Sequence, residues 1–210
     1  MVTQAERRAT TRTAVLDAAA ACLVENGVGG FTTADVVRRA GLSNGALFRY
    51  FPTKSDLLAA TVEHVFDRLR DDYQEAFRSL PDRQRTIATM LELLWGVMSD
   101  PALAAIYDVY TAARTDAWMQ AAIDPVARSH VARWQDMARE LVTELPDVDP
   151  TLIDQAVMLA ILAMQGLVVN LMAMPDPEAG RALVDQLVQL AAILLPAEPA
   201  PSPTPRGAHR

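Results

Sequence analysis

Residues 32–54, TTADVVRRAGLSNGALFRYFPTK, contain two complete sets of signals for starting and ending a short helix. Thr32 is a suitable N-cap, because its hydroxyl can accept a backbone N–H bond from the first turn. Gly41 follows the first helical stretch and can end it in the left-handed conformation. Ser43 is the N-cap of a second helix that ends near Phe51. Two short helices joined by a three-residue turn containing glycine predict a helix-turn-helix.

The second helix of this pair has the residue types that a DNA-reading helix needs. Gly45 and Ala46 at its start allow close approach to a major groove, and Asn44 and Arg49 can hydrogen-bond base edges. Nearby hydroxyls and a cation suit phosphate contacts. The candidate DNA-binding residues are Thr32, Thr33, Ser43, Asn44, Gly45, Ala46, Arg49, Tyr50 and Lys54. The alternative is a helical hairpin whose polar groups are only capped and hydrated.

The order of residues in this stretch resembles the N-terminal domain of the tetracycline-repressor (TetR) family. The matching positions are Thr32, Val36, Val37, Ala40, Gly41, Leu42, Ser43, Gly45, Leu47, Phe48, Tyr50, Phe51 and Lys54. Three positions depart from the family pattern: Asn44 where Lys or Arg is common, Phe48 where Tyr is common, and Val37 where Ala is common. The resemblance implies an all-α homodimer that binds a double-stranded DNA operator and a small-molecule effector. It also implies that the long helix beginning at Lys54 moves when the effector binds.

The distribution of charge supports a DNA-binding head, although the whole chain has a net charge of −7. Residues 1–58 contain seven basic and five acidic residues, which leaves a net charge of −9 for the rest. A basic head on an acidic body directs one end of the molecule toward phosphates. Arg7, Arg8 and Arg12 lie at the start of the first helix, against its dipole, where an anion such as DNA phosphate would stabilise them. Solvated charges on a fraying helix end are the alternative.

Helical periodicity and capping signals predict an all-α protein. Helices are expected over residues 5–26, 33–40, 44–51, 54–80, 83–98, 102–122, 126–145, 151–174 and 177–195, with Phe31 in the core of the head. We predict three parts: a three-helix head with the helix-turn-helix (1–52), a helical bundle for ligand binding and dimerisation (53–195), and a disordered proline-rich tail (196–210). Cys22 is the only cysteine and no apolar signal region begins the chain, so we expect a cytoplasmic protein.

The stretch 151–174 is the most apolar part of the chain. From Ala156 to Met174 only Gln165, Gly166 and Asn170 interrupt it, so a membrane span has to be considered. No Lys or Arg flanks the stretch and two amides lie inside it, which argues against a span. We expect a helix buried on nearly all sides, partly by its own body and partly by a partner.

The last predicted helix carries an apolar seam at 4-3-4 spacing. Together with the preceding helix it suggests a four-helix dimer interface, the role of the last two helices in the TetR family. The candidate interface residues are Leu159, Leu162, Leu183, Leu187, Leu190 and Leu194.

Catalytic and metal-binding motifs are absent from the sequence. It contains no GxSxG, GxxxxGK or HExxH pattern and no paired cysteines, and its three histidines are scattered. We therefore predict no enzyme activity, no metal site and no cofactor. An all-α enzyme is the rival hypothesis from another functional class.

Methionine and tryptophan are concentrated in the predicted body, which suits a pocket for an apolar effector. The candidate pocket residues are Trp95, Met98, Tyr107, Tyr110, Arg114, Trp118, Trp134, Met137 and Gln165. Ordinary core filling is the alternative, and Arg114 is expected to pair with an acid such as Asp116 or with an anionic effector. We predict a one-component transcriptional repressor released by a small, largely apolar effector. A DNA-binding dimer without an effector is the alternative.

Overall fold

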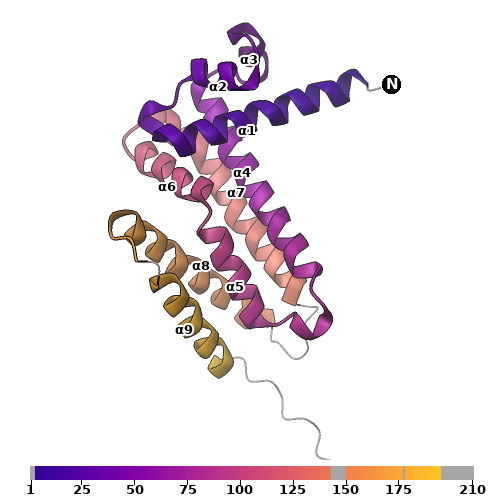
Figure 1. The fold of residues 1–210 in the computed structure, drawn as a ribbon, viewed down its shortest axis with the longest axis vertical. Helices are drawn as coiled ribbons and strands as arrows, with labels where there is room; N and C mark the ends of the chain where they lie inside the picture. The colour runs from indigo at the N-terminus through magenta and orange to yellow at the C-terminus, as the bar shows by residue number, and fades with distance from the viewer. Residues whose placement is uncertain (1–2, 143–149, 177, 195–210) are drawn as a thin grey trace, which may run out of the picture.

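The computed structural model describes residues 3–142, 150–176 and 178–194 (Figure 1). Within these ranges the chain forms nine α-helices, one short 3-10 helix and no strand, so the predicted all-α class is confirmed. The α-helices are α1 (Gln4–Gly30), α2 (Thr33–Ala40), α3 (Asn44–Tyr50), α4 (Lys54–Arg78), α5 (Ile87–Met98), α6 (Pro101–Ala113), α7 (Ala117–Val142), α8 (Pro150–Ala173) and α9 (Ala179–Leu194). The predicted tail and the proposed helix starter Pro177 lie outside the described residues.

The helix-turn-helix forms as its capping residues predict. The Thr32 hydroxyl accepts the Asp35 N–H at 3.1 Å, and the Ser43 hydroxyl accepts the Ala46 N–H at 3.2 Å. Gly41 ends α2 in the left-handed conformation with φ 67°. Phe31 is 1% exposed and fills the centre of the head beneath α1, α2 and α4. Local signals therefore place both short helices.

Helix α1 is longer than its periodicity predicts. The expected end lies at Asn26, and Gly27 does leave the helical conformation, with φ 61° and ψ −179°. A further helical turn then continues to Gly30, so α1 bends at Gly27 rather than ending there. The glycine is suited to this bend because its φ is unfavourable for residues with a side chain.

Helix α4 joins the head to the body. Thr53 and Asp56 form a capping box at its start, as the sequence predicts. Its buried stripe runs from Leu57 to Phe77, and it lies beside α7 along much of its length (Figure 1). The core is continuous across the predicted boundary at residue 52, since one cluster of buried side chains extends from α1 to α9.

Three predicted helix boundaries in the middle of the chain are wrong. A helix over 102–122 is not formed, because α6 ends at Ala113 and the Asp116 carboxylate caps α7 by accepting the Trp118 and Met119 N–H groups, each at 3.0 Å. Pro125 does not start a helix but lies inside α7, where it is exposed and the carbonyl it leaves unbonded can be hydrated. Residues Asp82–Gln84 form a 3-10 turn, and Thr86, two residues after this turn, caps α5, which therefore begins at Ile87 and not near Arg83.

Helix α8 is buried along one stripe only. Ala160, Met164 and Val168, at a spacing of four, face the body, whereas the rest of the described helix is exposed or half-buried. One chain therefore covers one face of α8, and the expected cover of the other faces by a partner stays a prediction. By length and hydropathy, Gln155–Ala173 passes as a candidate membrane span with a mean hydropathy of 2.1, and α5 with α6 passes only as a pair bent by 63°.

Candidate nucleic-acid interface and body cavities

The outer face of α3 carries the side chains predicted to read DNA. Asn44, Gly45 and Arg49 are exposed, while Leu47 is 1% exposed and anchors the helix on the head. Arg49 forms no ion pair with any residue of the described chain. A charged fork in this position is available for a guanine edge or a phosphate.

Gly45 has no role in the fold that requires a glycine. Its φ is not positive, and a Cβ built on it would meet nothing within 4 Å. Glycine in a helix also costs about 0.5–1 kcal/mol relative to alanine. The remaining physical reason for a bare backbone at the exposed start of α3 is close approach of another molecule.

Two cations of α1 lie next to α3. The Arg8 guanidinium lies 5.7 Å from the centre of the Tyr50 ring, and the Arg12 guanidinium lies 5.5 Å from that of Phe51. Lys54, at the start of α4, lies 5.5 Å from the Phe31 ring centre. These contacts hold positive charge around the recognition helix, so Arg8 and Arg12 belong in the candidate interface.

Both arginines of α2 form ion pairs with acidic residues of the head. Arg38 pairs with Asp35 at 2.6 Å, and Arg39 pairs with Glu25. The Thr32 hydroxyl accepts the Asp35 N–H and donates to its carboxylate at 2.6 Å, a bond that lowers the pKa of Asp35. Thr32 therefore uses its hydrogen-bonding capacity on the cap, and Thr33 is half-buried, which makes both weaker candidates for phosphate contact.

Phe48 is a candidate that sequence reasoning did not select. Its side chain is 44% exposed and lies four residues after Asn44, on the same side of α3. An exposed phenyl ring beside base-reading groups can contact a thymine methyl. In the sequence, Phe48 is recognisable only as a large apolar residue four positions after a polar one, and an ordinary core residue has the same pattern.

Two cavities lie among several helices of the described body, and both are partly open to solvent. An apolar cavity among α4, α5, α7, α8 and α9 has about 860 Å³ of empty space, a volume that includes solvent at its open mouth. A mixed cavity among α4, α5, α6, α7 and α8 encloses about 620 Å³ on the same measure. Trp134 and Ile161 line both, so the cavities meet at these two side chains.

The structure brings most of the predicted pocket residues to these cavities. Met98, Tyr107, Tyr110, Trp134 and Gln165 line the mixed cavity, and Met137 with Trp134 lines the apolar one. Arg114 is exposed and lines only a shallow hollow beside Tyr110, and it forms no ion pair with Asp116.

Besides Arg114, two predicted pocket residues line neither cavity. Trp118 is 84% exposed, because the chain turns after Ala113 and the helical periodicity on which its placement depended is broken there. The ring of Trp95 packs against Gly180 of α9, where an added Cβ would lie 2.1 Å from it. Helix α9 therefore covers Trp95 at a close approach that only glycine permits.

His130 is the titratable group of the mixed cavity. Its ring stacks on Phe66 of α4 with the two ring centres 3.3 Å apart. Burial, and then the positive charges of Arg133 and Arg70, lower the pKa of His130 from 6.5 to about 3. The imidazole is therefore neutral at physiological pH.

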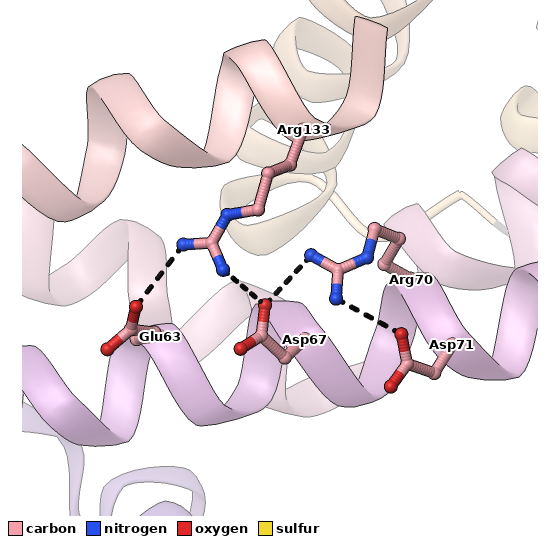
Figure 2. A network of polar contacts seen from close by, with 5 residues as sticks. All are labelled: Glu63, Asp67, Arg70, Asp71 and Arg133. Carbon is pink, nitrogen blue, oxygen red and sulfur yellow. Dashed lines mark hydrogen bonds and ion pairs between the residues drawn. The ribbon is translucent and has the colours of Figure 1, made fainter. Parts of the chain in front are cut away.

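A charged network ties α7 to α4 beside this cavity (Figure 2). The Arg133 guanidinium donates to Asp67 at 2.8 Å and to Glu63 at 3.3 Å, while Arg70 donates to Asp67 at 2.8 Å and to Asp71 at 3.1 Å. Because Arg133 directly precedes Trp134, the network fixes the helix face that lines both cavities.

The predicted dimer residues divide into two groups. Leu159, Leu162 and Leu190 are 51%, 56% and 39% exposed, whereas Leu183 and Leu187 are half-buried and pack on the core of their own chain. The side chain of Leu194 lies outside the described residues. Exposed apolar side chains also include Val169, Met172 and Ile193, so the uncovered apolar surface follows α8 and one edge of α9.

A metal site finds no support in the described part of the chain, where no group of three or more His, Cys, Asp or Glu residues is positioned to hold an ion.

Comparisons with known proteins agree with this arrangement. The sequence profile of the bacterial regulatory proteins of the tetR family matches residues 15–61. An HTH-type transcriptional regulator of Mycobacterium tuberculosis, itself uncharacterised, is 31% identical over 139 residues, which cover 66% of this chain and 71% of the relative.

Solved structures share the fold over most of the chain. A TetR transcription regulator from Haloarcula marismortui superposes with a TM-score of 0.70 at 18% identity, covering 88% of this chain and 98% of the other. The regulator FadR from Bacillus subtilis, crystallised with stearoyl-CoA, superposes with a TM-score of 0.58 at 15% identity, covering 84% and 95%. The relatives are transcriptional regulators rather than enzymes.

Proposed function

Since this chain belongs to the TetR family of DNA-binding transcriptional regulators, we propose that it is a one-component repressor whose operator is released by a small, largely apolar effector. In this proposal residues 1–52 bind DNA in the cytoplasm, and residues 53–195 bind the effector and form the homodimer. The observation that carries it is the exposed face of α3, next to which α1 contributes cations. This face presents Asn44, Gly45, where the fold does not require a glycine, and Arg49, which forms no ion pair within the described chain.

The effector part of the proposal rests on the two cavities. A mostly apolar space with a few polar groups is the usual form of a small-molecule site. One structural relative, FadR of Bacillus subtilis, was crystallised with stearoyl-CoA. A DNA-binding dimer without an effector remains the rival, and it requires both cavities to be simple packing voids.

The dimer part rests on α8 and α9. Leu159, Leu162 and Val169 are large apolar side chains, and within one chain at least half of the surface of each is exposed. Apolar surface that continues along two adjacent helices marks a protein interface. A second copy packed on this face gives two heads, as a two-half-site operator requires.

The function is tested by substitutions on α3 that leave the fold intact. Gly45→Ala adds one methyl group to open surface, so the melting temperature should stay the same or rise while operator affinity falls. Arg49→Ala should lower operator affinity by about 1–3 kcal/mol if Arg49 contacts a base, with relaxed specificity at one base pair. Fluorescence anisotropy on the operator, read at several salt concentrations, measures both effects.

Thr115→Ala is the matched control, because Thr115 is exposed at the α6–α7 turn and lies outside the helix-turn-helix. It should leave operator affinity unchanged. Wild-type affinity in both α3 variants would remove this helix from the DNA interface.

A further inference from the structure

We propose that the effector is an uncharged amphiphile, with an apolar chain in the apolar cavity and a neutral hydrogen-bonding head in the mixed cavity. This inference rests on the proposed effector function and deepens it by naming the chemical class of the ligand.

The apolar cavity offers a ligand almost nothing except hydrocarbon contacts. Among the described residues of its lining, Tyr73 carries the only hydroxyl, and that hydroxyl already donates to the Met90 carbonyl at 3.2 Å. The other polar group is the indole N–H of Trp134. This N–H is buried below the cavity surface and has no hydrogen-bond partner in the described chain. A polar ligand group placed here would lose its hydration without replacement, so this cavity selects an apolar chain.

The polar groups of the mixed cavity are gathered from three helices. Tyr107 and Tyr110 come from α6, His130 from α7 and Gln165 from α8. The Tyr107 hydroxyl has only the weak acceptor Sδ of Met98, 3.8 Å away. The Gln165 amide has no hydrogen-bond partner within the described chain. These groups can satisfy a ligand that both donates and accepts hydrogen bonds.

Charge is absent from both linings. No described residue that lines either cavity is Asp, Glu, Lys or Arg. Burial keeps the His130 imidazole neutral by lowering its pKa to about 3, and burial raises the pKa of Tyr107 to about 12. The guanidinium of Arg133, whose charge acts on His130, is already paired with Glu63 and Asp67 (Figure 2). A charged head group would therefore lose its water without gaining a counter-ion, which is strongly unfavourable.

The two cavities lie next to each other, because Trp134 and Ile161 form part of each lining. We place one ligand across both cavities, with these two side chains at the boundary between its hydrocarbon and polar ends. A ligand with one polar end matches this division in a single orientation, with its chain directed toward α9 and its head toward α6.

The head group is tested with three compounds that each carry a ten-carbon chain and differ in their head group: decanamide, decanoate and decyltrimethylammonium. Calorimetric titration of the full chain should show decanamide binding at least about tenfold more tightly than either ion, because only the ions bury an unpaired charge. Equal or tighter binding of decanoate or decyltrimethylammonium overturns the proposal.

The position of the chain is tested by its length. From hexanamide to decanamide the affinity should rise by about fourfold per methylene, the factor for transferring one CH₂ from water to an apolar site. Affinity that does not change with chain length removes the chain from the apolar cavity and overturns the proposal.

The orientation is tested with Gln165→Leu, which should weaken decanamide by about three- to tenfold through the loss of one hydrogen bond. Asn170→Leu is the matched control, because it also replaces an amide on α8, but this amide is exposed and donates to the Gly166 carbonyl at 2.8 Å. Equal effects of the two variants contradict the assignment of Gln165.

Operator release is measured separately with the same compounds. Binding of decanamide without release of the operator contradicts the proposed repressor mechanism and leaves the ligand class supported. Release by another compound, with no member of this panel bound, overturns the ligand class and leaves the mechanism supported.

Discussion

His130 illustrates how a single residue acquires its properties from the side chains around it. An imidazole in water has a pKa near 6.5, but here it stacks on Phe66 and faces Arg133 and Arg70. Burial and the two positive charges lower its pKa to about 3. The same shift that makes His130 a neutral hydrogen-bonding group makes its protonation unfavourable for the folded state.

The stability of the protein should therefore fall as the pH drops below about 6.5. In that range the unfolded chain protonates His130 and the folded chain does not, so the unfolded state binds more protons and gains stability at lower pH. The slope is about 1.4 kcal/mol per pH unit, or about 2 kcal/mol between pH 6.5 and pH 5. Urea unfolding at these two pH values, at one protein concentration, measures it.

His130→Phe removes the titrating group and keeps a ring against Phe66. Its free energy of unfolding should change less between the two pH values than that of the parent protein. The same slope in both proteins would show that His130 is not responsible.

At the scale of helices, α4 and α7 are held by packing first and by charge second. Phe77 of α4 is fully buried, whereas Arg133 is 33% exposed and its partner Asp67 is 37% exposed. Ion pairs with this much access to water are worth about 1 kcal/mol or less, and truncating a buried phenyl ring costs about 3–5 kcal/mol. The network in Figure 2 therefore orients the two helices more than it stabilises them.

Arg133→Met should consequently lower the free energy of unfolding by about 1 kcal/mol, far less than Phe77→Ala. Arg128→Met is the matched control, because Arg128 pairs only with Asp124 of its own helix. It should have a smaller effect than Arg133→Met. Urea unfolding gives all three values, and an Arg133 effect as large as that of Phe77 would contradict this ranking.

At the scale of the whole molecule, the apolar surface of α8 and α9 determines which substitutions can separate the proposed dimer cleanly. Leu187, a natural choice from the leucine spacing, packs on its own core and lines the apolar cavity. Leu162 and Ile193 are 56% and 74% exposed, so charge at these positions harms one chain little and a dimer interface strongly.

Leu162→Glu with Ile193→Glu should yield folded monomers that lose specific operator binding, since one head cannot contact two half-sites roughly 34–36 Å apart. Sedimentation velocity and circular dichroism measure assembly and folding. Trp118→Glu is the control, because Trp118 is a large apolar side chain that is 84% exposed and belongs to neither α8 nor α9, and this variant should leave the dimer intact. A parent chain that sediments as a monomer would end the dimer proposal.

The amino-acid sequence by itself determined the helix-turn-helix, the start of α4 and the all-α class. Thr32, Gly41, Ser43 and Thr53 act on the backbone within three or four residues of themselves, so their effect does not depend on distant contacts. For the same reason the outward-facing candidates Asn44 and Arg49 were accessible to sequence reasoning. The resemblance to the TetR family, on the same residues, added the expectation of a dimer and an effector.

Only the tertiary structure decided which body residues meet. Periodicity placed Trp118 and Trp134 on inner faces alike, but the turn at Asp116 leaves Trp118 exposed and packing buries Trp134 between two cavities. Periodicity likewise could not show that Leu187 packs against the core of its own chain, whereas Leu162 is exposed and can contact a partner. Apolar spacing specifies that a face must be covered, whereas what covers it depends on contacts between helices far apart in the chain.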